Sequence, residues 1–105
     1  MSRTAAYLRF YPADTSTPLV HQAALRAYAD TLALPYPTVY LDDGLSWRCP
    51  LPAYERLLEA VRSGWHDAVL IPGPWVFALP DDFARARMKQ LAYYCRVLEL
   101  PRARR

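Results

Sequence analysis

The sequence predicts an α/β domain: an open, mostly parallel sheet with flanking helices, in the order βαβαβα. Short apolar or β-branched runs alternate three times with longer segments in which apolar residues recur every three or four positions. Prolines and turn residues separate these segments. Strands that alternate with helices pair in parallel through right-handed crossovers, which gives one sheet with helices packed on it.

The first strand is expected over residues 4–11, and a helix is expected to follow it. Ser16 and Thr17 can cap this helix, and Pro18 suits its first position because the missing N–H costs nothing there. The helix runs to about Leu32, because the prolines that follow prevent its continuation. One helical face is formed by His21, Ala24, Leu25, Tyr28 and Leu32.

The second strand and helix are marked by similar signals. Thr38–Leu41 is β-branched and aromatic, and the turn signal Asp42-Asp43-Gly44 ends it. A helix ends at Ser63-Gly64, where glycine suits the left-handed cap. Its apolar stripe is Tyr54, Leu57, Leu58 and Val61.

The third strand and helix complete the predicted order. Ala68–Ile71 is a continuous apolar run closed by Pro72-Gly73-Pro74, which is typical of a strand covered on both faces. Asp81 then caps a third helix. Its expected apolar face is Ala84, Met88, Leu91, Cys95 and Leu98.

Charge is unevenly placed along the chain. Of thirteen basic residues, three lie in Arg102, Arg104 and Arg105, which leaves ten bases against ten acids in residues 1–101. We therefore predict a domain over residues 1–100 and a basic tail over residues 101–105. A neutral body offers few cations for phosphate contacts, so no DNA binding by this chain alone is expected.

Other composition features narrow the class of protein. The apolar runs are shorter than a membrane span, and the N-terminus lacks the pattern of a secretory signal, so we expect a cytoplasmic protein without membrane contact. Cys49 and Cys95 form no metal-ligand spacing with His21 and His66. We expect reduced packing thiols, no metal and no cofactor.

Several segments, in this order and spacing, resemble the catalytic domain of serine recombinases of the resolvase/invertase type. They are Tyr7-Leu8-Arg9, Gln22, residues 40–46, residues 52–58, Arg62-Ser63-Gly64 and residues 67–71. The resemblance runs from about residue 4 to residue 100 and implies a resolvase-like fold. It also implies DNA cleavage by a serine that becomes covalently bound to phosphate, with an arginine cluster that stabilises the phosphate under attack.

This sequence departs from the family pattern at the residues that carry the chemistry. Arg9 matches one of the arginines, but Tyr11 stands at the nucleophile's position. The arginine-containing stretch after the third strand falls on residues 75–79, which carry no positive charge, and Leu51 stands where another arginine is usual. Ser46 is followed by tryptophan where the family has glycine. One transition-state arginine can be worth about 10³–10⁵ in rate, so we do not expect an enzyme.

Two functional hypotheses follow. The first is a catalytically inactive recombinase-like domain that acts as a protein interaction or regulatory module and binds itself, a regulatory protein or a functional recombinase. The alternative is an enzyme that acts on a phosphoester or recombines DNA through Arg9, Arg48 and an unrecognised nucleophile. Because the family's dimer helix and DNA-binding module do not fit beyond Leu100, we also expect a stand-alone domain.

Ligands of such sheets gather at the carboxyl ends of the strands. The candidate interaction or vestigial-site residues there are Arg9, Tyr11, Asp42, Ser46, Arg48, Trp75 and Phe77. Tyr11 is expected to pack or to donate a hydrogen bond, and Arg9 either binds an anion or pairs with Asp42, Asp43 or Asp67. Trp75 and Phe77 either contact a protein partner or pack on their own sheet.

The third predicted helix has more apolar surface than one sheet face needs. This excess predicts self-association and favours a homodimer. The candidate residues are Met88, Leu91, Tyr94 and Leu98.

Overall fold

A computed structural model of the chain describes residues 3–10, 17–43, 51–73, 76 and 81–101. The elements are β1 (Thr4–Phe10), α1 (Thr17–Thr31), β2 (Thr38–Asp43), α2 (Pro52–Arg62), β3 (Ala68–Ile71), α3 (Asp81–Ala92) and β4 (Arg96–Glu99). The predicted α/β class is confirmed, and a fourth strand follows the six predicted elements. No helix among the described residues is long and apolar enough to cross a membrane.

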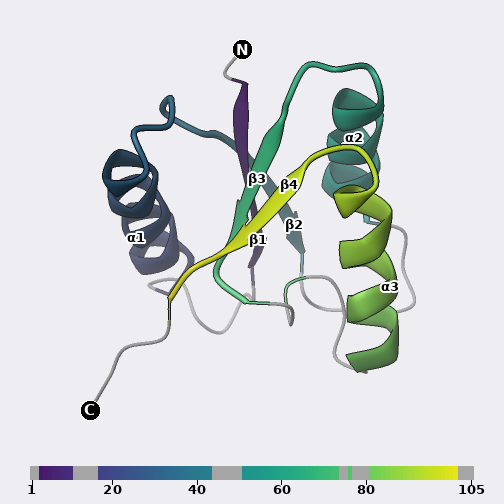
Figure 1. Cartoon of the computed structure of the whole chain (residues 1–105). Helices are drawn as coiled ribbons and strands as arrows, with labels where there is room; N and C mark the ends of the chain where they lie inside the picture. The colour runs from purple at the N-terminus through teal and green to yellow at the C-terminus, as the bar shows by residue number, and fades with distance from the viewer. Residues whose placement is uncertain (1–2, 11–16, 44–50, 74–75, 77–80, 102–105) are drawn as a thin grey trace.

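The four strands form one sheet in the order β2-β1-β3-β4, and every neighbouring pair is parallel. Helix α1 covers one face of this sheet, and α2 and α3 lie on the other (Figure 1). This arrangement follows from right-handed crossovers. The chain moves from β1 to β2 at one edge, returns past β1 to β3 and then continues to β4 at the other edge, so the helix of the first crossover lies on the opposite face from the other two.

Each face of the sheet has its own apolar core. Ala6 and Leu8 of β1 pack toward α1, whereas Ala5 and Tyr7 pack toward α2 and α3, as the two-residue period of a strand requires. All four residues of β3 are buried, as predicted for a strand covered on both faces.

The prediction for the end of the third helix is wrong. Helix α3 ends at Ala92, Cys95 lies in the turn that follows, and Leu98 belongs to β4, where it packs against the core under α1. The backbone amide of Cys95 donates to the carbonyl of Leu91, and that of Arg96 donates to the carbonyl of Asp67. The chain therefore leaves the helix and begins pairing with β3 within four residues.

Helices α1 and α2 end in the same hydrogen-bond pattern. At the end of α2 the amide of Gly64 donates to the carbonyl of Val61 and that of Trp65 to Ala60, and Gly64 has a φ of 81°. At the end of α1 the amide of Ala33 donates to Asp30 and that of Leu34 to Ala29. Both are Schellman motifs, whose left-handed position favours glycine. The predicted glycine cap is confirmed at Gly64, while in α1 an alanine, Ala33, occupies this position with a φ of 55°.

Candidate functional site

Arg9 and Asp42 lie side by side at the carboxyl end of the sheet. They are register partners on β1 and β2, and the two residues are only 2% and 3% exposed. Since Arg9 follows Tyr7 by two residues, it shares the face of β1 that is covered by α2 and α3. The structure thus brings together two of the seven predicted site residues.

Asp42 holds the first turn of α2. Its carboxylate accepts hydrogen bonds from the backbone amides of Ala53 and Tyr54, both at 2.8 Å. The start of α2 needs such an acceptor, because Leu51 at the N-cap has no polar side chain and Pro52 has no N–H. A carboxylate at this end also interacts favourably with the helix dipole. Asp42 therefore acts as a capping residue supplied from a neighbouring strand.

Tyr7 completes this buried cluster. Its hydroxyl donates to Oδ2 of Asp42 at 2.7 Å. Its ring meets that of Tyr54 edge to face, with centroids 5.9 Å apart. The Asp42 carboxylate thus accepts three hydrogen bonds, from one side chain and two amides.

Helix α3 closes the cluster from the other side. The hydroxyl of Tyr54 donates to Oε1 of Gln90 at 2.6 Å, and the carbonyl of Arg87 lies 3.2 Å from the same hydroxyl. The guanidinium of Arg87 lies 5.6 Å from the centroid of the Tyr54 ring. Tyr54 lies on the predicted apolar stripe of its helix, whereas no sequence pattern marked Arg87 or Gln90 as a site residue. The signal in the sequence that could have indicated these contacts was the Tyr54 hydroxyl, because a tyrosine with a buried ring needs a polar partner for its hydroxyl.

Both tyrosine hydroxyls are held in the neutral form. Burial raises the pKa of Tyr7 far above its usual range, and the hydrogen bond to Asp42 and the charge of Asp42 raise it further, against smaller opposing effects of Arg9 and Arg87. Burial raises the pKa of Tyr54 to about 12, with Arg87 opposing the shift. A raised pKa keeps both phenols protonated, so neither is activated as a nucleophile through a lowered pKa.

The other predicted site residues lie elsewhere or outside the described residues. Asp67, one of the carboxylates proposed as a partner of Arg9, pairs with Arg3 at 2.9 Å on the surface. Tyr11, Ser46, Arg48, Trp75 and Phe77 lie outside the described residues. The alternative hypothesis, in which Arg9 and Arg48 act together on a phosphoester, therefore stays a hypothesis.

The candidates for self-association do not form one exposed helical face. Leu91 is fully buried, Met88 packs against the core, and Leu98 lies on β4. Of the four, Tyr94 is exposed, at 43%, and its neighbour Tyr93 is exposed at 83%. The excess surface assigned to a long third helix is explained by the shorter helix and the extra strand.

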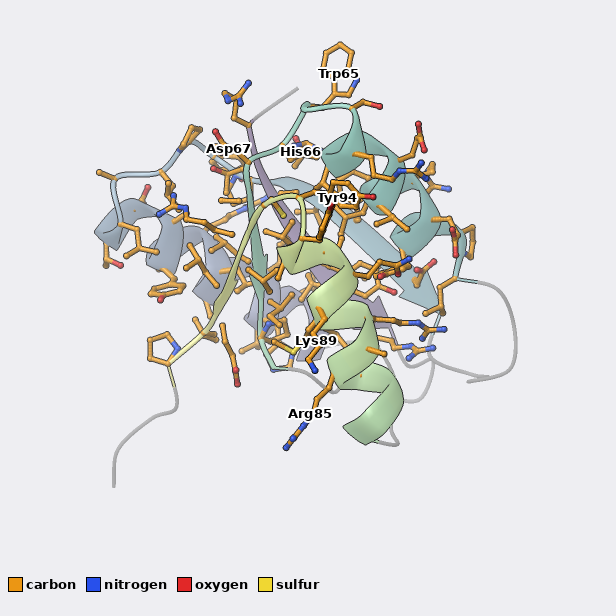
Figure 2. All side chains as sticks on the ribbon, turned by 45° about the vertical axis from the view of Figure 1, so that its right-hand side comes forward. Trp65, His66, Asp67, Arg85, Lys89 and Tyr94 are labelled. Atoms are coloured by element: carbon orange, nitrogen blue, oxygen red, sulfur yellow. The ribbon has the colours of Figure 1, made fainter. Side chains whose placement is uncertain are left out.

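A second buried polar pair, at the amino end of the sheet, was not predicted. The hydroxyl of Tyr40 and Nε2 of His66 are 2.8 Å apart, and both residues are buried. The adjacent Trp65 is exposed and extends from the turn between α2 and β3 (Figure 2). The described part of the chain contains no group of three or more His, Cys, Asp or Glu residues suited to a metal ion.

Comparison with known proteins relates this fold to one class of enzyme domain. No family model and no curated protein matches the chain. Among solved structures, the chain is similar to the crystal structure of the N-terminal catalytic domain of TP901-1 integrase, a serine recombinase. The TM-score is 0.63 at 19% sequence identity, and the match covers 92% of this chain and 75% of that chain. The resemblance seen in the sequence is thus confirmed at the level of the fold, and the chain has the fold of a serine recombinase catalytic domain.

Proposed function

We propose that this domain is a protein interaction or regulatory module that has the fold of a serine recombinase catalytic domain without its chemistry. The observation that carries the proposal is the burial of Arg9, the arginine that matches the family's phosphate-stabilising cluster. Arg9 is 2% exposed and its guanidinium nitrogens are buried, so it offers almost no surface to a phosphate from solvent. Its neighbour Asp42 is committed to Tyr7 and to the first turn of α2.

The sequence adds support for this proposal. A tyrosine stands at the family's nucleophile position, and residues 75–79 carry no cation where an arginine-containing stretch is usual. Phosphoryl transfer depends mainly on positioning and on electrostatic stabilisation of the phosphate, so the loss of several cations removes the main source of catalysis.

A cleavage assay tests the absence of chemistry. The chain is incubated with supercoiled plasmid and with nicked oligonucleotides, and covalent protein–DNA adducts are sought on denaturing gels, with an active serine recombinase on its own site as the positive control. We expect neither nicking nor adduct. An adduct that is lost in Tyr11→Phe or in Arg48→Ala would contradict the proposal and establish the alternative, an enzyme acting on phosphoesters.

The module role predicts an interaction between proteins, which can be a contact between two copies. Light scattering at several concentrations measures self-association directly. A monomer that persists at high concentration would exclude the homodimer and leave a heterologous protein as the partner.

A further inference from the structure

Every charged residue between Ala84 and Leu98 is basic. This segment contains Arg85, Arg87, Lys89 and Arg96 and no aspartate or glutamate. In residues 1–101 as a whole, by contrast, ten acids balance ten bases. Within α3 these cations follow Asp81 and Asp82, so the excess of positive charge lies in the segment that begins after these two aspartates and ends before Glu99.

The outward face of α3 combines these cations with exposed aromatic rings. Arg85 and Lys89 are exposed and one helical turn apart, which places their Cβ atoms about 6 Å from each other. Tyr93 and Tyr94 follow at the end of the helix, with ring centroids 4.9 Å apart and planes at 80°. Figure 2 shows Arg85, Lys89 and Tyr94 along α3, with the Arg85 side chain extending from the lower part of the helix.

Lys89, Tyr93 and Tyr94 line an open hollow of about 780 Å³, together with residues that contact the buried cluster, and Arg85 lies one helical turn before Lys89, outside this lining. Its lining residues are Ala86, Arg87, Lys89, Gln90, Tyr93 and Tyr94. Gln90 is fixed by the hydroxyl of Tyr54, and the guanidinium of Arg87 lies over the Tyr54 ring. Two of the lining residues, Arg87 and Gln90, therefore contact the buried cluster, while Tyr93 and Tyr94 are exposed.

The fold does not require this face to be aromatic. Helix α3 packs on the sheet through Ala84, Met88 and Leu91, which lie on its opposite side. Large apolar rings that stay exposed beside cations are typical of interaction sites, where tyrosine and arginine are enriched.

We propose that the outward face of α3, made up of this hollow and the adjacent Arg85, binds an acidic segment of a partner protein. Carboxylates of the segment face Arg85 and Lys89, and an apolar or aromatic side chain lies against Tyr93 and Tyr94. Two carboxylates at i and i+4 of a partner helix have the same spacing as the two cations. This inference rests on the proposed module function, for which it names the face and the chemistry of the partner.

A protein segment fits this face better than a nucleic acid does. The four cations of the segment can neutralise at most about four phosphates, and single-strand binding that depends on so few contacts is weak at physiological salt. The rest of residues 1–101 holds six bases and ten acids, so its net negative charge adds no extended path for a phosphate backbone. Short-range pairing with two or three carboxylates needs no such path.

The test measures binding of defined probes by fluorescence anisotropy. The first probe is a labelled peptide of about 16 residues with glutamates at i and i+4 beside leucine and tryptophan, and the second has glutamine at the glutamate positions. The third is a labelled oligothymidine that carries at least as many negative charges as the first peptide. We expect the glutamate peptide to bind best and to weaken as NaCl rises from about 50 to 300 mM, because exposed charge pairs are screened by salt.

Matched variants locate the site. The double variant Arg85→Glu/Lys89→Glu is expected to weaken binding of the glutamate peptide by at least about tenfold, and Tyr93→Ala is expected to weaken both peptides. The control Arg26→Glu/Arg62→Glu changes net charge equally at exposed arginines of α1 and α2 and should bind as the wild type does. Circular dichroism confirms that each variant is folded.

Three outcomes would overturn the inference. They are equal binding of the two peptides, equal loss in the two double variants, and tighter binding of oligothymidine than of the glutamate peptide, which would indicate a nucleic-acid surface. None of these results bears on the cleavage assay. If the α3 face binds no acidic peptide, the proposed module function can still hold, and the partner would then contact another face of the domain.

Discussion

The carboxylate of Asp42 accepts a hydrogen bond from the hydroxyl of Tyr7 at 2.7 Å and so joins two neighbouring strands beneath α2. The same carboxylate binds the amides of Ala53 and Tyr54, which fixes where the helix begins. Among the described residues, the carboxyl ends of β1 and β2, where ligands of such sheets usually bind, therefore carry a buried structural cluster. Its stability can be tested one residue at a time.

Replacing Asp42 should cost more stability than replacing any surface carboxylate. Asp42→Ala leaves three buried donors without their acceptor, and we expect the free energy of unfolding to fall by about 3 kcal/mol or more. Asp42→Asn keeps one acceptor oxygen and should cost less. Urea denaturation monitored by circular dichroism measures both changes.

The control for this experiment is Asp67→Asn. It removes the exposed ion pair with Arg3 and should cost less than about 1 kcal/mol. If Asp42→Ala is no more destabilising than this control, the carboxylate does not anchor α2.

The Tyr7 hydroxyl should make stability depend on pH in the alkaline range. Folding raises the pKa of this group, whereas a tyrosine in the unfolded chain titrates near pH 10. The stabilising contribution is therefore fully present below about pH 10 and decreases as pH rises above it, because the unfolded chain releases the proton first. Tyr54, with a pKa of about 12, contributes in the same direction.

The variant Tyr7→Phe separates the contribution of Tyr7 to this pH dependence from that of Tyr54. At neutral pH the variant should lose about 1–2 kcal/mol, the value of a hydrogen bond to a charged acceptor. Above pH 10 its free energy of unfolding should fall less steeply than that of the wild type, by up to about 1.4 kcal/mol per pH unit. Denaturation curves collected between neutral pH and about pH 11 test this, and parallel profiles for the two proteins would contradict it.

Arg9 is predicted to act as a structural cation beside Asp42. Arg9→Met keeps the length and the apolar stem of the side chain but removes the charge, and we expect a loss of about 3 kcal/mol. The control is Arg62→Met, at an exposed residue whose guanidinium lies 3.7 Å from Oε2 of Glu59. It should lower the free energy of unfolding by less than about 1 kcal/mol.

A double-mutant cycle shows whether Arg9 acts through Asp42. If the two charges interact, Arg9→Met combined with Asp42→Asn should be less destabilising than the sum of the single changes. Additive losses would mean that Arg9 stabilises another part of the fold.

Most of the fold could be predicted because its signals are local. Apolar runs, helical periodicity and turn residues mark the first six elements. Strand β4 was missed because Arg96–Glu99 is short and carries a charge at each end, and because Leu91, Cys95 and Leu98 also fit a helical spacing. This strand forms only because the edge of β3 is available to pair with it, which is a property of the folded sheet.

The candidate site was predictable in position but not in its contacts. Arg9 and Asp42 were placed at strand ends from the order of elements alone. The capping role of Asp42 depends on α2 lying against β2, although a signal existed in the helix start, where Leu51-Pro52 offers no side-chain acceptor. The contact of Tyr54 with Gln90 joins two helices far apart in the sequence and has no local signature.

The two Schellman motifs allow a prediction with opposite signs for two related substitutions. Gly64→Ala places a Cβ at a φ of 81°, where no atom lies within 4 Å, so any cost arises from the backbone conformation alone. We expect a loss of about 1 kcal/mol, the usual penalty of a left-handed residue that has a Cβ.

Ala33→Gly removes the same strain at a φ of 55° and should raise the free energy of unfolding by roughly 0.5–1 kcal/mol, although glycine normally destabilises through the entropy of the unfolded chain. Ala27→Gly, at an exposed position within α1, serves as the control and should cost about 1 kcal/mol. Urea denaturation of the three variants decides the matter, since a loss of stability in Ala33→Gly as large as that in Ala27→Gly would mean that the left-handed position in α1 carries no strain for glycine to relieve.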